Sequence, residues 1–171
     1  MQVLEDLMHL IAPPERRRAA GAGEVDTSCG PDACLGLGRM VLDEVARALI
    51  DGDNPAVLAT TNADGSPQTS VVWVGRDGDD VLISTGQGRK KDRNVRQDPR
   101  VSVIVIDKDD PLRYVEIRGT AAVSPDVDRE LAQQLAEKYE GEGAGQEYVD
   151  LPPEVIRIVI RVTAEKVHVR S

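Results

Sequence analysis

A run of basic residues is the strongest candidate for a binding site in this chain. Positions 89–100 read Arg-Lys-Lys-Asp-Arg-Asn-Val-Arg-Gln-Asp-Pro-Arg, with a net charge of +4 from six basic and two acidic side chains. The remainder of the 171-residue chain carries −13, from 15 basic and 28 acidic residues. The run follows a strand-like segment ending in Ser84-Thr85 and a flexible Gly86-Gln-Gly88 loop. This order brings hydroxyls, loop N–H groups and a helix N-terminus to one spot, which suits a phosphate.

The same run also fits a solvated helix face whose charges pair with neighbouring Asp residues. From the residues alone, both interpretations stay open. A nucleotide-binding P-loop is excluded, because Gly86-Gln-Gly88 lacks the Lys-Ser/Thr ending and the spacing of that motif.

Composition and charge exclude several other functions. The net charge of −9 argues against a nucleic-acid or anionic-membrane binder, and the aromatic content of 2% leaves few platforms for base stacking. His9 and His168 lie near opposite ends of the chain, which argues against a zinc site. Cys29 and Cys34 are too few for a disulfide scaffold and are expected to be reduced. With no run of 18 apolar residues and no basic leader at the N-terminus, we expect a cytoplasmic protein that binds no metal.

Two parts of the chain differ in pattern. Residues 1–39 contain a long stretch with no hydrophobic period, and we expect a flexible N-terminal extension there. The pattern of a folded domain covers 40–171 and begins at Met40, which makes Met40 a candidate translation start that an N-terminal mass measurement on native protein would test.

The folded part reads as mainly β. An amphipathic helix is predicted at 42–50, a polar helix at 88–98, and a third helix after Pro125 with Val127, Leu131, Leu135 and Tyr139 as its inner stripe. Strands are predicted at 56–61, 69–74, 81–85, 101–107, 112–123 and 155–169, and the first three, joined by Asp-Gly loops, predict an antiparallel meander. Six mostly antiparallel strands with two or three helices indicate a small closed barrel.

Three segments in order resemble the pyridoxamine-phosphate-oxidase-like, flavin-binding split-barrel superfamily. They are Asn54–Val74, Gly88–Val101 and Tyr114–Ala121, and the similarity covers about 42–169. The complete Arg-x-Lys-x-x-Asn-x-x-x-Asp-Pro-Arg pattern resembles most the actinobacterial branch that uses the deazaflavin coenzyme F420. The resemblance implies a six-stranded antiparallel split β-barrel with flanking helices.

The resemblance also implies a site. Arg89, Lys91 and Asn94 would hold the phosphate and acidic tail of the coenzyme, while Thr85 and Gln87 would complete the loop beside them. Ser70, Val71, Val72 and Trp73 would line the tricyclic ring. Members of this branch are homodimers with the coenzyme at the subunit interface, so residues of a partner chain should contribute.

The function implied is an F420H2-dependent oxidoreductase that passes a hydride to a small apolar or conjugated substrate. The alternatives are an FMN-dependent reductase or oxidase of the same fold, and a non-catalytic protein that binds F420 or a tetrapyrrole. Vitamin B6 oxidation is disfavoured, because the Arg-containing substrate signature of true pyridoxamine phosphate oxidases has no match here. No catalytic side chain is assigned, and a structural role is favoured for Tyr114 and His168.

Overall fold

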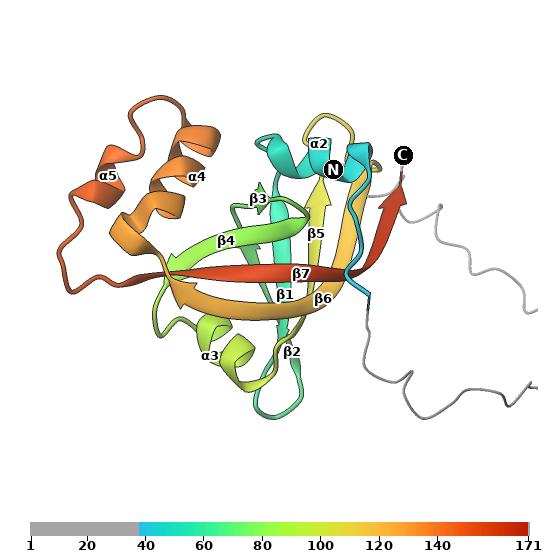
Figure 1. Cartoon of the computed structure of the whole chain (residues 1–171), viewed down its shortest axis with the longest axis horizontal. Helices are drawn as coiled ribbons and strands as arrows, with labels where there is room; N and C mark the ends of the chain where they lie inside the picture. The colour runs from blue at the N-terminus through green and yellow to red at the C-terminus, as the bar shows by residue number, and fades with distance from the viewer. Residues whose placement is uncertain (1–37, 171) are drawn as a thin grey trace, which may run out of the picture. The chain divides into compact units, whose positions relative to one another are not determined.

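The computed structural model describes residues 38–170 of the chain (Figure 1). Most of the extension predicted at 1–39, including Cys29 and Cys34, lies outside this range. At its described end, Arg39 Nη2 lies 3.2 Å from Asp80 Oδ1, and the Met40 N–H donates to the Ala164 carbonyl at 2.8 Å. The chain therefore contacts the sheet from Arg39 onward.

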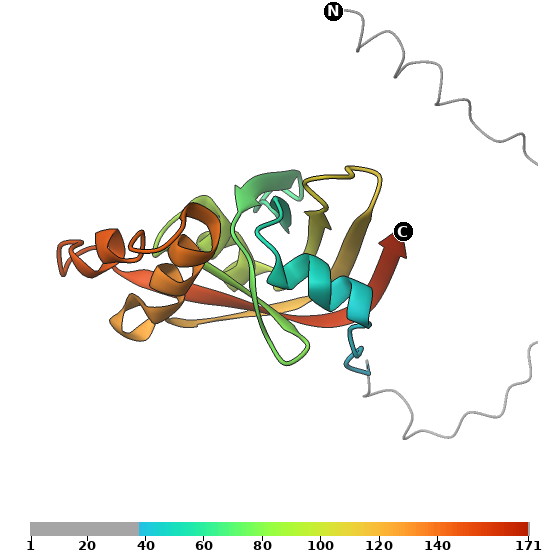
Figure 2. The ribbon, with the colours of Figure 1, turned by 90° about the horizontal axis from the view of Figure 1, so that it is seen from above.

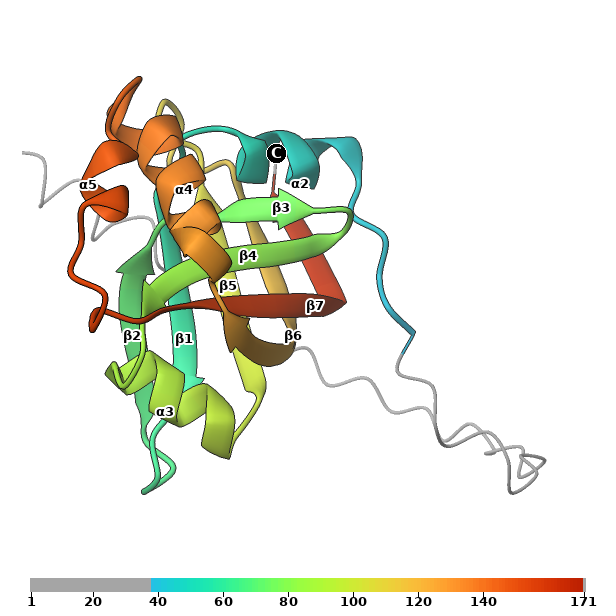
Figure 3. The ribbon, with the colours of Figure 1, turned by 60° about the vertical axis from the view of Figure 1, so that its left-hand side comes forward.

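The described residues form one antiparallel sheet of seven strands, which confirms the mainly β prediction. The strand order is β2-β1-β5-β6-β7-β4-β3, and the sheet curls into a barrel (Figure 3). The strands are β1 (Ala56–Thr61), β2 (Pro67–Val72), β3 (Gly75–Asp77), β4 (Asp80–Gly86), β5 (Arg100–Ile106), β6 (Tyr114–Pro125) and β7 (Arg157–Arg170). The sequence analysis did not predict β3. Its three residues pair with Asp80–Leu82, but they have the composition of a loop.

The predicted meander is wrong in its third strand. β1 pairs with β2 and β5, whereas β4 pairs with β7 and β3. The chain leaves β2 at Val72 and passes through Trp73 and Val74 to the other edge of the sheet before it forms the β3–β4 hairpin. The reversal therefore occurs at Asp77–Asp80, within β3 and β4, and not between β2 and β4.

Two helices cover the ends of the barrel (Figure 1). α2 (Glu44–Asp51) begins at Asp43, whose carboxylate accepts from the Ala46 N–H at 2.7 Å, and it buries Ala46, Leu49 and Ile50. α3 (Lys90–Gln97) lies at the opposite end, against β1 and β6. Both helices agree with the ranges predicted from the sequence, and the core between them is aliphatic.

The segment between β6 and β7 forms the third helical part, on one side of the barrel (Figure 2). It contains η2 (Val127–Arg129), α4 (Glu130–Glu140) and α5 (Gln146–Val149). Leu131 and Leu135 are buried as predicted, but Val127 is 68% exposed. The prediction fails there because Asp128 and Arg129 adopt positive φ values of 52° and 58°, which breaks the helical period before α4.

β6 and β7 are the longest strands and pair along their whole length, with one bulge at Arg118/Gly119. A Cβ atom at Gly119 would lie 1.9 Å from the Thr163 carbonyl oxygen, so this bulge requires glycine. Within residues 38–170, no helix has the length and apolar character that crossing a bilayer demands.

Candidate functional site

A cavity of about 230 Å³ lies between the end of β2, the start of α3, and the adjoining ends of β4 and β7. Its lining comprises Val71, Val72, Trp73, Ser84, Lys91, Tyr148 and Arg157. Four of these residues, Val71, Val72, Trp73 and Lys91, were predicted from the resemblance. The structure thus brings the predicted apolar wall and one predicted cation together.

The apolar wall is fixed from behind by the end of α4. The Trp73 ring stacks on the Tyr139 ring with centroids 5.4 Å apart and planes 8° apart. The Tyr139 hydroxyl accepts from the Val74 N–H at 3.2 Å and donates to the Asn54 carbonyl at 2.9 Å. Lys138 donates to the Val74 carbonyl at 2.8 Å. Trp73 therefore lines the cavity as predicted and also packs as a structural residue against the end of α4.

Lys91 and Arg157 give the cavity a positive charge. Burial lowers the pKa of Lys91, and the neighbouring Arg89 and Arg157 lower it further. Burial is also the main cause that lowers the pKa of Arg157. Within residues 38–170, neither of these side chains nor Arg89 forms an ion pair.

The basic run divides into two halves with different partners. In its second half, Arg96 pairs with Asp92 and Arg100 pairs with Asp98, each at 2.6 Å. In its first half, the cations at 89–91 have no carboxylate partner among the described residues. The interpretation as a solvated, self-paired face thus fits the second half, whereas Arg89 and Lys91 in the first half retain charge for an external anion.

The loop before α3 does not offer its amides as predicted. The Gln87 N–H donates to the Ile156 carbonyl at 2.9 Å, and the Gly88 N–H donates to Asp92 Oδ2 at 2.7 Å. The Arg89 N–H donates to the Gly86 carbonyl at 3.3 Å. These three donors are engaged within the chain, so side chains, and not this loop backbone, supply the positive end of the site.

The remaining predicted residues lie outside the cavity lining. Asn94 is buried, and its amide nitrogen donates to Thr60 Oγ1 and Asn62 Oδ1, both at 3.0 Å, which attaches α3 to the end of β1. Ser70 accepts from the Gln68 amide at 2.8 Å. Arg89 and Gln87 are exposed on the loop next to Lys91.

Ser84, and not the predicted Thr85, lines the cavity. Because side chains alternate along a strand, Thr85 faces the core at 6% exposure and Ser84 faces the cavity. Tyr114 and His168 sit at the other end of β6 and β7, with ring centroids 6.3 Å apart. Both lie away from this lining.

Sequence reasoning missed Tyr148 and Arg157 as site residues, and it placed the Ser84 hydroxyl near the anion site without assigning it to the coenzyme. Arg157 carried a weak signal, since it is one of two arginines, with Arg161, in the otherwise apolar run 155–162. Tyr148 carried none, because it follows a Gly-rich segment whose path back to the barrel no local pattern specifies.

A larger hollow of about 580 Å³ lies elsewhere, beside β1, β5 and the β6–β7 bulge. Its charged lining residues are Arg100, Arg118, Glu165 and Lys166, and it contains none of the residues predicted to bind a coenzyme. We favour the smaller cavity as the functional site because it combines an apolar, aromatic wall with cations that lack counter-charges. An anionic ligand that carries a flat ring fits these residues.

Comparison with known proteins agrees with this fold. The family model described as pyridoxamine 5'-phosphate oxidase matches residues 42–170. A solved F420 reductase is 28% identical, with a TM-score of 0.63, covering 74% of this chain and 98% of its own. The conserved hypothetical protein Rv2991 of Mycobacterium tuberculosis is 22% identical, with a TM-score of 0.61, covering 78% and 87%.

A heme binding protein of Mycobacterium smegmatis also shares the fold, at 22% identity and a TM-score of 0.54, covering 76% of this chain and 55% of its own. The chain belongs to the pyridoxamine 5'-phosphate oxidase family of flavin-binding split barrels.

Proposed function

We propose that this protein is an F420H2-dependent oxidoreductase that passes a hydride to a small apolar or conjugated substrate. The observation that carries the proposal is the cavity in which Trp73 and Lys91 meet, an aromatic wall beside a cation without a counter-charge. The 28% identity to a solved F420 reductase supports the same coenzyme class.

The residues of this chain have two tasks in such a reaction. Lys91, with Arg89 on the adjoining loop, neutralises the phosphate and acidic tail of the coenzyme. Val71, Val72 and Trp73 present an apolar surface against which a ring is oriented. When bound, the reduced deazaflavin supplies the hydride, so the protein contributes binding, orientation and the exclusion of water.

We also propose that a second copy of the chain completes the site. The cavity volume of about 230 Å³ lies below the roughly 300–1,000 Å³ typical of small-molecule pockets. Val71, at its edge, is 78% exposed, which is unusual for an apolar residue beside a ligand. A homodimer that covers Val71 would enlarge the pocket and bury this side chain. Light scattering of the purified protein tests the dimer.

FMN is the alternative coenzyme, because it carries a phosphate that the same cations suit. The family is a flavin-binding one, and this supports FMN as well. A reductase or oxidase that uses FMN therefore remains the second candidate.

A pair of titrations tests the proposal. Trp73 is the only tryptophan and lines the cavity, so quenching of its fluorescence reports directly on occupancy. We expect F420 to bind with a Kd at least tenfold lower than that of FMN. The reverse order would make the protein an FMN enzyme, and binding of neither would overturn both. Oxidation of F420H2 in the presence of enones, quinones or tetrapyrroles then separates an enzyme from a binding protein.

A further inference from the structure

Arg157, at the start of β7, is a cation whose hydrogen-bonding capacity is largely unused. Its Nη2 donates to Ser84 Oγ at 3.1 Å, and its Nε is buried without a hydrogen-bond partner among the described residues. A guanidinium has five N–H donors, and leaving a buried donor unpaired is unfavourable. The side chain lines the cavity, so a ligand there would contact the same guanidinium.

Ser84 and Asp126 orient this guanidinium without neutralising it directly. The Ser84 hydroxyl donates to Asp126 Oδ2 at 2.9 Å, so its lone pairs remain for Arg157. The Asp126 carboxylate also accepts from the Leu131 and Ala132 N–H groups at 3.0 and 3.1 Å. The charge of Asp126 is therefore engaged at the start of α4, one hydroxyl away from the guanidinium.

Tyr148 lies across the face of the same guanidinium. Its ring centroid is 5.0 Å from Arg157 Cζ, within the range of a cation–π interaction. Tyr148 is held there by Arg129, which donates to the carbonyls of Tyr148 at 3.2 Å, Leu151 at 2.8 Å and Pro152 at 2.7 Å. Arg129 thus holds the segment between α5 and β7 in place, and this positions Tyr148.

We propose that Arg157 binds the phosphate of the ligand in this cavity together with Lys91, and that Tyr148 is a positioning residue that holds the guanidinium in place. A planar guanidinium can make two parallel hydrogen bonds to a phosphate, whereas Lys91 supplies a point charge. The identity of the ligand as a coenzyme rests on the proposed function. The anion site itself rests only on the contacts of Arg157.

The test compares Arg157→Gln with Arg170→Gln, which removes the same charge from an exposed position at the far end of β7. Titrations use F420, FMN and inorganic pyrophosphate, the last followed by thermal shift. Hydrogen bonds to charged groups contribute enough that Arg157→Gln should raise the Kd by about 10- to 100-fold. It should also make the dependence of Kd on KCl shallower, because one charge contact is lost. Arg170→Gln should change Kd less than twofold.

Two further variants separate positioning from folding. Arg157→Lys keeps the charge but not the planar fork, and we expect an intermediate Kd; it decides the question if Arg157→Gln does not fold. Tyr148→Leu removes the ring and should raise Kd by about 2- to 5-fold, whereas Tyr148→Phe should bind like the unaltered protein.

The outcomes distinguish this inference from the proposed function. If the unaltered protein binds F420 or FMN and Arg157→Gln binds it equally well, with Arg157→Lys also unchanged, the inference is overturned and the coenzyme assignment stands. If the unaltered protein binds neither coenzyme, the proposed function fails and pyrophosphate decides. Stabilisation by pyrophosphate that disappears in Arg157→Gln supports the anion site, and the absence of any stabilisation overturns it.

Discussion

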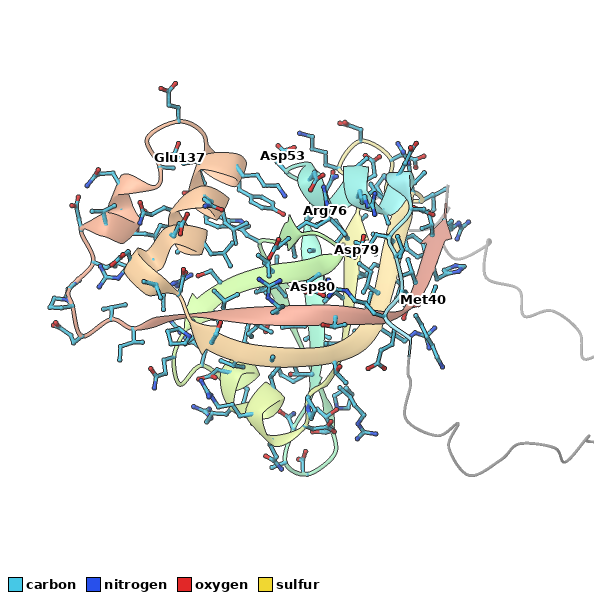
Figure 4. All side chains as sticks on the ribbon, viewed as in Figure 1. Met40, Asp53, Arg76, Asp79, Asp80 and Glu137 are labelled. Carbon is cyan, nitrogen blue, oxygen red and sulfur yellow. The ribbon has the colours of Figure 1, made fainter. Side chains whose placement is uncertain are left out.

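Two regions of this molecule concentrate charged side chains, and they differ in whether those charges form ion pairs. At the turn between β3 and β4, the side chains of Asp79 and Asp80, both labelled in Figure 4, form ion pairs with arginines. Arg47 pairs with Asp79 at 2.8 Å, and Arg161 pairs with Asp80 at 3.0 Å. At the cavity, Lys91 and Arg157 line the wall and Arg89 lies on the adjoining loop, and none of the three forms an ion pair with a described residue.

The difference separates charges that stabilise the fold from charges that are available to a ligand. Paired groups near the β3–β4 turn attach α2 and the chain before it to the sheet, and Asp79 has a lowered pKa mainly because Arg47 donates to it. The cavity cations repel one another and are partly desolvated, which is unfavourable for folding on its own. Such an arrangement is typical of functional sites.

The largest expected effect is on stability, from Asp80→Asn. Asp80 is 4% exposed and lies within ion-pair distance of Arg161 and Arg39. Removing one partner of a buried pair is strongly unfavourable, and because both arginines are partly exposed we expect a loss of about 2 kcal/mol in the free energy of unfolding. Urea denaturation measures it. Coenzyme affinity should stay within twofold.

Asp77→Asn is the matched control, because Asp77 also pairs with Arg161 but its side chain is 65% exposed. A loss of less than about 0.5 kcal/mol is expected from this variant. Equal effects of the two substitutions would show that burial does not distinguish the pairs.

Lys91→Gln should show the opposite profile to Asp80→Asn. It should raise the Kd for F420 by about tenfold, because a charge-assisted contact to the anion is lost, while the free energy of unfolding stays equal or rises. Lys90→Gln removes the neighbouring charge from an exposed position and is the control. Fluorescence titration and urea denaturation of both variants measure the two quantities. An unchanged Kd for Lys91→Gln would contradict the coenzyme site proposed here.

A smaller effect is expected from pH. Since burial lowers the pKa of Lys91 from 10.5, this side chain loses its proton at a lower pH than an ordinary lysine. The ratio of the Kd of Lys91→Gln to that of the unaltered protein should therefore fall toward one as pH rises toward 10.5.

The free energy of unfolding of the ligand-free protein should rise with pH, whereas the ratio of the two Kd values falls. In the window between the lowered pKa and 10.5, the unfolded chain binds more protons at position 91 than the folded chain. The free energy of unfolding therefore rises with pH there, and Lys91→Gln removes that part of the rise. Lys138, whose pKa burial lowers to about 8, contributes a similar rise that both proteins share. For the binding prediction, a ratio of the Kd of Lys91→Gln to that of the unaltered protein that does not change with pH would show that Lys91 does not titrate near the ligand.

Local patterns of the sequence predicted where the helices and strands lie better than they predicted which strands pair. The helix at 42–50 and the strands β1, β5, β6 and β7 follow from hydrophobic periodicity, which is a local property. The placement of β4 beside β7 could not be predicted, because it depends on how Trp73 and Val74 cross the sheet. That crossing is held by Tyr139, more than sixty residues away in the chain.

The site divides along the same line. Lys91 and the Val71–Trp73 wall were predictable because they belong to contiguous motifs. Thr85 was chosen where Ser84 faces the cavity, and a shift of one residue along a strand moves a side chain to the opposite face. Asn94 was assigned to the ligand, but in the structure its amide nitrogen donates to Thr60 and Asn62, residues that no local pattern relates to it.

The helix α4 connects two walls of the cavity. Its start is bonded to Asp126, which reaches Arg157 through Ser84, and its end stacks Tyr139 on Trp73. The eight-residue step from Leu131 to Tyr139, at 1.5 Å for each residue, sets a spacing of about 12 Å between these two attachments. Single substitutions in the lining alter the chemistry of the pocket, whereas the length of one helix fixes its dimensions. Evolution of a relative for a longer or shorter ligand would therefore proceed by insertion or deletion in α4.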